Sequence, residues 1–213
     1  LMAAAFIWVC TIKVNETKAD VPPSLKSGLG LLKKPVYALA VLGIFLYVGS
    51  EVCMARFLLP LLEKMGLEET TASRFGPAFF FLMLTVGRLG GGAVLNFLSQ
   101  RTFFRLSALM GLAGGLILMF GAAKIAVLGV LLAGLGFANI WPMLFSITVE
   151  KDPARGSELS GLMCMAISGG ALVPLVMSKL VDMELGTKAF IVPVICFVYL
   201  LVLSLEKDQP KQD

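Results

Sequence analysis

Long apolar stretches alternate with polar segments along the chain. A first stretch, Leu1 to Ile12, carries no charge, and six longer stretches follow it. These six cover approximately residues 36–62, 75–98, 106–123, 125–149, 159–180 and 189–205. A helix of about 20 apolar residues crosses the hydrocarbon core of a bilayer. The pattern therefore predicts an all-α membrane protein with six transmembrane helices.

The first apolar stretch is too short to cross a membrane. Its residues would extend about 18 Å as a helix, against a core of about 30 Å. We therefore interpret residues 1–12 as the end of a spanning helix that starts before Leu1. Residues 13–34 are then a polar linker with five lysines, in which Gly28 and Gly30 act as helix breakers. Residues 35–205 form the six-helix bundle, and residues 206–213 form a polar tail.

The composition agrees with a membrane location and argues against several other classes. Hydrophobic residues make up 58% of the chain and charged residues 15%, against about 25% charged residues in soluble domains. The chain has no histidine, and its four cysteines show no CxxC spacing. Histidine is a common general base and metal ligand, so we expect no enzyme, metal or cofactor. The net charge of +4 gives no reason to expect a nucleic-acid partner.

Lysine and arginine are distributed unequally between the two sides of the predicted membrane. An even number of spans places the linker and the tail on one side, which carries eleven of these residues, while the other side carries five. Because positive residues accumulate on the cytoplasmic side, we expect the linker and the C-terminus to be cytoplasmic. Arg56 and Arg88 lie within spans and belong to neither side.

The six spans divide into two groups of three. The first span contains LGIFLYVGSE from Leu42, and the fourth contains the weakly similar LGVLLAGLGF from Leu128. Each of these spans opens a group of three helices, and because three is odd, the second group is inverted relative to the first. Inverted repeats of this kind are common in secondary transporters.

Glu51 and Tyr47 are the first candidates for binding a substrate. Glu51 lies some 22 Å along the first span, where a charge costs around 2.5–3.5 kcal/mol. Tyr47 is four residues earlier, on the same helix face. We expect both to face an aqueous cavity, where a hydroxyl and a carboxyl group suit the hydroxyls of a sugar. The alternative is a structural ion pair of Glu51 with Arg88, or with Arg56, which points off the Glu51 face and is assigned a structural role.

The segment GFANIWPMLFS in the fourth span is the second candidate. Pro142 has no N–H to donate, so it frees a carbonyl near residue 138. Asn139 supplies a donor and an acceptor, and Trp141 supplies a flat apolar surface of the kind that stacks on sugar rings. We expect both to line the site, with an interhelical hydrogen bond for Asn139 and plain packing for Trp141 as the alternatives.

Arg88 lies in the glycine-rich segment VGRLGGG of the second span. Gly87 and Gly91 form a GxxxG pair, which lets helices approach closely. We assign Arg88 a structural or gating role near the cytoplasmic end of its span. In the charged loop EKDPARGSE, Arg155 and Glu158 form either a solvated turn or a charge network that latches the cytoplasmic face.

These segments resemble the C-terminal half of a major facilitator superfamily transporter, most closely the fucose/glucose–galactose:proton symporters. The resemblance covers essentially the whole chain and rests on FLYVGSEV, VGRLGGGAVLNFLSQR, GFANIWPMLFS and RGSELSGLMCMAISGGALVPLVMSKLVD. It implies twelve helices in two bundles, with the Leu1 stretch as the end of helix 6 and the six spans as helices 7 to 12. Helices 7 and 10 would line a central sugar cavity. The segment after Gly87 lacks the acidic residue and basic doublet of the superfamily's motif A.

The resemblance implies a secondary active transporter that carries a sugar with a proton by alternating access. The expected substrate is a hexose or deoxyhexose such as fucose, glucose or galactose. The proton gradient is the driving force, and the bacterial inner membrane is the location. The proton-coupling carboxylates of this group lie in the N-terminal six-helix half, the expected partner of this chain. The alternatives are a transporter of a non-sugar solute on the same fold and a self-contained six-span permease subunit.

Overall fold

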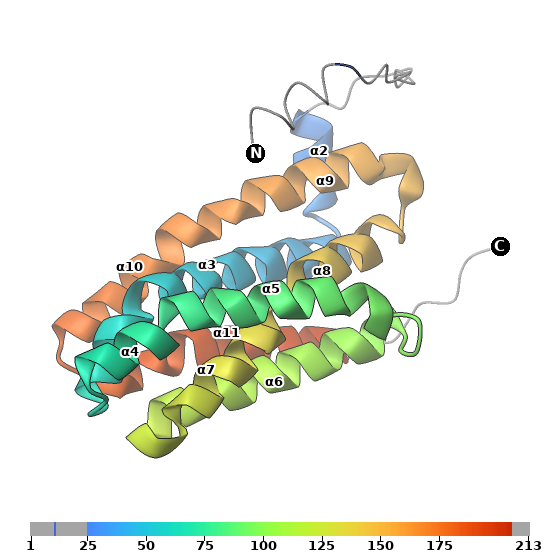
Figure 1. The fold of residues 1–213 in the computed structure, drawn as a ribbon. Helices are drawn as coiled ribbons and strands as arrows, with labels where there is room; N and C mark the ends of the chain where they lie inside the picture. Colours follow the sequence, from blue (N-terminus) through green and yellow to red (C-terminus); the bar gives the residue numbers. More distant parts are fainter. Residues whose placement is uncertain (1–10, 12–24, 206–213) are drawn as a thin grey trace.

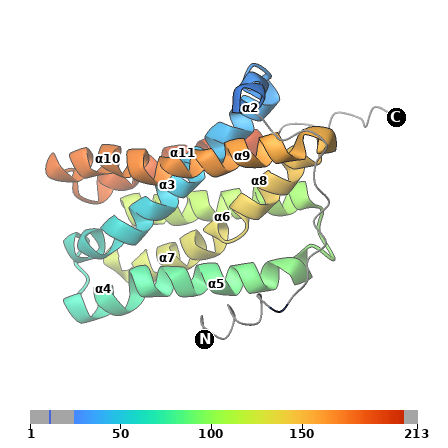
Figure 2. The same cartoon turned by 90° about the horizontal axis from the view of Figure 1, so that it is seen from above.

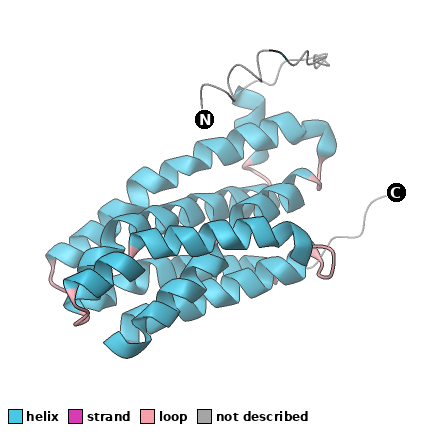
Figure 3. Cartoon of the chain, in the orientation of Figure 1, coloured by secondary structure: helices cyan, strands magenta, loops and turns pink. Residues whose placement is uncertain are grey.

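The predicted spans are helical in the computed structural model of the protein (Figure 1). The structure describes Thr11 and residues 25–205. Apart from Thr11, the predicted end of helix 6 lies outside these residues, as do most of the linker and the tail. Within the described part, six helical segments are long and apolar enough to cross a membrane. They are joined by short loops (Figure 3).

The elements are named by their order along the chain. The α-helices are α2 (Leu25–Leu31), α3 (Pro35–Lys64), α4 (Glu69–Phe75), α5 (Pro77–Val94), α6 (Gln100–Phe120), α7 (Ala123–Phe137), α8 (Ile140–Val149), α9 (Gly156–Met165), α10 (Gly169–Asp182) and α11 (Ile191–Ser204). Three short 3₁₀ turns are η1 (Pro153–Arg155), η2 (Ala166–Ser168) and η3 (Gly186–Phe190). The second, fourth and fifth spans are therefore each built from two consecutive helices.

Several helices begin earlier than the apolar pattern predicted. The third span was expected from Leu106, after a tight turn, but α6 starts at Gln100 because the Ser99 side chain caps it by accepting from the Thr102 N–H at 3.2 Å. The polar loop predicted over residues 63–74 contains α4, which carries Glu69 in its first turn. A carboxylate is favourable at this end of a helix. Helix ends thus follow caps and terminal charges rather than the limits of the apolar stretch.

The predicted linker contains a helix where the sequence indicated breaks. Gly28 and Gly30 both lie inside α2 and do not end it. Tertiary packing provides the reason, because Leu31 is buried in a cluster with Tyr37, Leu159 and Leu162. The apolar contact with α9 thus stabilises a short helix that glycine disfavours by itself.

The packing of the spans follows the predicted three-plus-three arrangement. In such a repeat the first, second and third spans correspond to the fourth, fifth and sixth. The contact between α3 and α10 then corresponds to the contact between α7 and α5, and both contacts are present. Likewise, the contact between α6 and α7 corresponds to the contact between α11 and α3, and both are present. Figure 2 shows α9 and α10 beside α3 on one side of the bundle and α5 beside α7 on the other.

An aromatic cluster fixes the centre of the bundle where α7 ends. The Phe137 ring lies 4.6 Å from Phe197 of α11, 5.4 Å from Phe80 of α5 and 5.7 Å from Tyr47 of α3, measured between ring centroids. All four side chains are buried. The end of α7 is thereby held against three other spans, which determines where the break in the fourth span lies.

Candidate functional site

The fourth span breaks between α7 and α8, at Ala138 and Asn139, which lie four and three residues before Pro142. Asn139 has φ −118° and ψ 3° at this break, in the sparsely populated bridge region of backbone conformations. Proline has no N–H to give the Ala138 carbonyl, and the Arg88 Nε donates to that oxygen instead, at 3.1 Å. The hydroxyl of Tyr47 donates to the Phe137 carbonyl at 3.0 Å. The predicted free carbonyl near residue 138 is therefore present and is satisfied by a side chain from another span.

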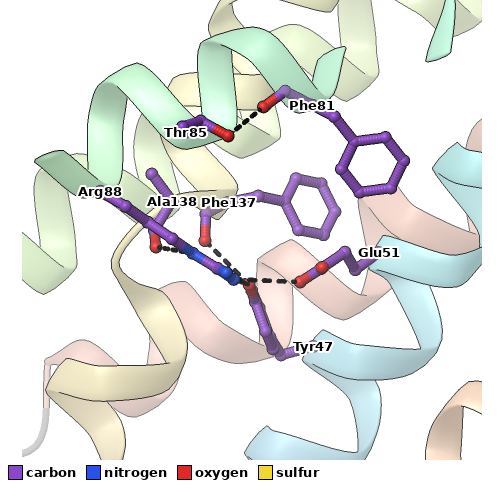
Figure 4. Close-up of polar contacts among 7 residues, drawn as sticks. All are labelled: Tyr47, Glu51, Phe81, Thr85, Arg88, Phe137 and Ala138. Atoms are coloured by element: carbon purple, nitrogen blue, oxygen red, sulfur yellow. Dashed lines mark hydrogen bonds and ion pairs between the residues drawn. The ribbon is translucent and has the colours of Figure 1, made fainter. Parts of the chain in front are cut away.

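Glu51 and Arg88 form an ion pair beside this break (Figure 4). The Arg88 Nη2 lies 3.8 Å from the Glu51 Oε2 and 3.4 Å from the Tyr47 hydroxyl. The Glu51 side chain is 23% exposed and that of Arg88 is 48% exposed, so the pair is open on one side. Of the two partners considered for Glu51, the structure selects Arg88. The exposed Arg56 instead lies 5.6 Å from the ring of Phe57.

The direction of the side chains explains how Arg88 and Glu51 meet although their backbones lie at different depths along their spans. Arg88 is six residues from the end of α5, about 9 Å by helix rise, in agreement with its predicted place near that end of the span. Side chains tilt toward the N-terminus of their own helix, and α3 and α5 run in opposite directions. The guanidinium of Arg88 and the carboxylate of Glu51 therefore converge from opposite sides, and the charge of Arg88 lies deeper than its backbone.

The Asn139 side chain joins the break to α5. Its amide nitrogen donates to the Gly87 carbonyl at 2.8 Å, and the residue is 8% exposed. This contact matches the interhelical hydrogen bond considered as the alternative to sugar binding. The GxxxG pair makes the contact possible. A Cβ at Gly87 would lie 2.6 Å from that of Ala138, and one at Gly91 would collide with the Asn139 amide.

Trp141 and Pro142 occupy the first turn of α8. Trp141 is partly buried against the core and stacks on Phe145, with ring centroids 5.1 Å apart and an angle of 18° between the rings. Pro142 is exposed. One face of the Trp141 ring is therefore engaged by Phe145.

The loop between α8 and α9 contains the second predicted charge pair. The Arg155 guanidinium donates to Glu158 and also to the carbonyl and hydroxyl of Ser27 in α2, at 3.0 and 2.9 Å. The Tyr37 hydroxyl donates to Asp152 at 3.4 Å nearby. Of the two interpretations of this loop, the structure matches the charge network, which fastens α2 to the start of α9.

Two polar groups near these sites were missed from the sequence. Thr85 is exposed one turn before Arg88, and its hydroxyl donates to the Phe81 carbonyl at 2.8 Å (Figure 4). The spacing of three residues from Arg88 was the available signal. Ser27 had no signal, because its role depends on how the linker packs against α9.

A small cavity lies away from Glu51, at the end of the bundle where α3 begins. Its volume is ≈ 20 Å³, and its lining includes Val36, Arg101, Lys151 and Ser204. A space of this size holds about one water molecule, so it is too small for a sugar. The open side of the Glu51–Arg88 pair is the better candidate for binding a solute.

Comparison with known sequences and structures defines the class of the chain. No family model matches it. It is 33% identical over 170 residues to a glucose/galactose transporter of Brucella abortus biovar 1 (strain 9-941), covering 78% of this chain and 41% of the relative. It is 29% identical over 200 residues to a putative glucose/galactose transporter of Helicobacter pylori (strain J99), covering 92% and 49%. The chain thus spans about half the length of these curated relatives.

Solved structures agree on the fold. A single-residue variant of the fucose:proton symporter of Escherichia coli matches with a TM-score of 0.79 at 19% identity, over 95% of this chain and 51% of that chain. A structure of this major facilitator superfamily transporter in the outward conformation gives a TM-score of 0.77 at 20% identity, over 95% and 50%. The fold is therefore that of one six-helix half of a major facilitator superfamily transporter. Its sequence relatives are glucose/galactose transporters, so the predicted resemblance is confirmed, and these relatives are transporters rather than enzymes.

Proposed function

We propose that this chain is the C-terminal half of a sugar:proton symporter that carries a hexose or deoxyhexose such as glucose, galactose or fucose. The observation that carries the proposal is the open polar cluster of Tyr47, Glu51 and Arg88 beside the α7–α8 break. A carboxylate that accepts and a guanidinium that donates are the groups that hydroxyl-rich solutes need. The names of the relatives, glucose/galactose transporter and fucose:proton symporter, support the same substrate class.

The contacts suggest a distinct role for each residue of the site. Glu51 accepts from sugar hydroxyls, and Tyr47 fixes the end of α7 and shapes the floor of the site. Trp141 offers its remaining apolar surface to the sugar ring. Asn139 has its amide nitrogen on the Gly87 carbonyl, which leaves its oxygen as the group for a sugar or for the break itself. Gly87, Gly91 and Pro142 set the shape of the seam between α5 and the fourth span.

The rest of the cycle would depend on a partner bundle. In alternating access, two six-helix bundles rock around a site near the membrane midplane. We propose that an N-terminal six-helix half provides the opposite wall and the proton-coupling carboxylates, and that the proton gradient drives uptake across the bacterial inner membrane. The fold match to half of a solved transporter favours this arrangement over a self-contained permease subunit.

Transport by the intact protein tests the proposal. The transporter, with both halves, is reconstituted in vesicles, and uptake of labelled galactose is measured after an inward proton gradient is imposed. We expect uptake above the concentration of the medium, its loss with a protonophore, and competition by glucose or fucose. Competition only by carboxylates or by apolar drugs would instead support a non-sugar transporter on the same fold.

The orientation of the bundle has its own test. Single cysteines are placed at the exposed positions Glu68, between α3 and α4, and Ala154, between α8 and α9, in a protein whose native cysteines are replaced. A membrane-impermeant maleimide should label position 68 in intact cells and position 154 only after permeabilisation. The reverse pattern would contradict a cytoplasmic linker and C-terminus.

A further inference from the structure

The guanidinium of Arg88 is anchored at one end and loosely held at the other. Its Nε lies 3.1 Å from the Ala138 carbonyl, within the usual range for an N–H···O bond. Its Nη2 lies 3.4 Å from the Tyr47 hydroxyl and 3.8 Å from the Glu51 carboxylate, distances longer than that range. The outer end of the fork thus faces Glu51 across a gap, in a pair that is open on one side (Figure 4).

The two groups on either side of this gap have opposite hydrogen-bonding properties. A guanidinium only donates, an ionised carboxylate only accepts, and a hydroxyl does both. A hydroxyl placed between them accepts from Arg88 and donates to Glu51, so both charged groups gain a partner. A half-exposed ion pair contributes little to stability, so such an insertion costs little. The fork geometry of arginine also allows a neighbouring hydroxyl to be bound at the same time.

We propose that Arg88 binds the substrate directly, and that Arg88 and Glu51 together form a donor–acceptor pair for adjacent sugar hydroxyls. This inference rests on the proposed sugar transport and adds a specificity residue to it. It replaces the structural or gating role that the sequence indicated for Arg88.

Pro142 is the positioning residue of this arrangement. In a continuous helix the N–H of residue 142 would bond to the Ala138 carbonyl, the same oxygen that accepts from the Arg88 Nε. Because proline has no N–H, the oxygen is left for Arg88. An alanine at position 142 restores a donor that competes with Arg88 for this oxygen and thereby weakens the anchor of the guanidinium.

Deoxy sugars test the contact one hydroxyl at a time. Affinities for galactose and for its 2-, 3-, 4- and 6-deoxy analogues are measured on the intact transporter and on Arg88→Met. We expect one deoxy analogue, or two adjacent ones, to bind about 10- to 100-fold more weakly than galactose to the unchanged protein. In Arg88→Met this discrimination should shrink at that position and at no other, because the hydroxyl has lost its donor while the Glu51 acceptor remains.

Proline variants test the anchor. Pro142→Ala should weaken galactose binding several-fold, and Pro142→Ala combined with Arg88→Met should bind no more weakly than Arg88→Met alone. Pro60→Ala is the matched control, because Pro60 is also an exposed proline inside a helix and lies more than two turns from Glu51. The control should bind galactose normally. Arg88→Lys keeps the charge without the fork, so it should retain part of the discrimination if Arg88→Met does not fold.

Three outcomes would overturn the inference. One is that each deoxy analogue loses the same affinity relative to galactose in the unchanged protein as in the Arg88 variants. Another is an additive effect of the changes at positions 88 and 142, which would show that they act independently. An intact transporter that binds no hexose at all would contradict the proposed function itself, and the inference with it, whereas the first two outcomes leave sugar transport standing.

Discussion

Two arginine–glutamate pairs in this protein differ in how completely their charges are satisfied. Arg155 and Glu158 are three residues apart in one turn, and Arg155 also donates to two oxygens of Ser27. Arg88 and Glu51 come from different spans and lie 3.8 Å apart. The first pair is in direct hydrogen-bond contact and is joined to a third residue, whereas the second keeps a gap between its charges.

The difference agrees with an Arg155–Glu158 pair that holds structure and with the ligand-binding role that we propose for Arg88 and Glu51. The Arg155 network connects α2 with α9, and its contacts are short on every side. The Arg88 fork is held closely at the Ala138 carbonyl and more loosely at Tyr47 and Glu51, so its outer end can donate to another molecule. Changes at the two pairs should therefore separate binding from structure.

The largest expected effect is on transport, from Glu51→Gln. In the proposed function the Glu51 carboxylate accepts a charge-assisted hydrogen bond from a sugar hydroxyl, which the amide weakens. Hydrogen bonds to charged groups contribute about 1.5–3 kcal/mol. We expect sugar uptake to fall about 10-fold or more, with unchanged insertion measured by the yield of membrane-extracted protein.

Glu158→Gln is the matched change at the Arg155–Glu158 pair. It should leave uptake within about twofold of the unchanged protein, because ion pairs near the surface contribute little to stability. Equal losses in the two variants, or normal uptake kinetics in Glu51→Gln, would remove Glu51 from the site.

The seam between α5 and the fourth span should respond to a single methyl group. Gly91→Ala places a Cβ against the Asn139 amide, and overpacking of this kind costs about 1–3 kcal/mol. We expect a lower melting temperature of the purified protein. Gly90→Ala, one residue away with nothing within 4 Å of the new Cβ, should leave the melting temperature unchanged or raise it. A similar fall in both variants would show that the helix, rather than the seam, is affected.

Asn139→Ala separates the two roles considered for Asn139. The change removes the interhelical donor to the Gly87 carbonyl, and such a hydrogen bond contributes about 0.5–1.5 kcal/mol net. If the residue serves the break, stability falls while the ratio of galactose to deoxygalactose affinities stays constant. A changed ratio at one hydroxyl would instead place the Asn139 oxygen on the sugar.

The smallest expected effect comes from opening the Arg155 network. Arg155→Ala removes the donors to Ser27 and Glu158 but leaves Leu31 packed against Leu159 and Leu162. We expect faster hydrogen–deuterium exchange of the amides of residues 25–31, with exchange in α5 unchanged, and only a modest change in uptake. Unchanged exchange in α2 would show that the apolar contact alone holds it.

Much of the architecture followed from the sequence because membrane helices have a strong and simple signal. Runs of apolar residues predicted the six spans, since a backbone in lipid must satisfy its own hydrogen bonds. The absence of an N–H at Pro142 also predicted the free carbonyl near residue 138, a consequence of covalent structure. The limits of the spans were less accurate, because the cap at Ser99 and the helix within residues 69–75 depend on polar residues outside the apolar pattern.

The sequence by itself thus determined how many times residues 35–205 can cross a membrane, the inverted grouping of these spans and the free carbonyl in the fourth span. Only the tertiary structure decided that Arg88, and not Arg56, meets Glu51, and that Asn139 bonds to the Gly87 carbonyl. It also decided that α2 forms despite two glycines. The physical reason is the same in each case: hydropathy and proline act along one helix, whereas a partner for a side chain depends on which helices pack together and at what rotation.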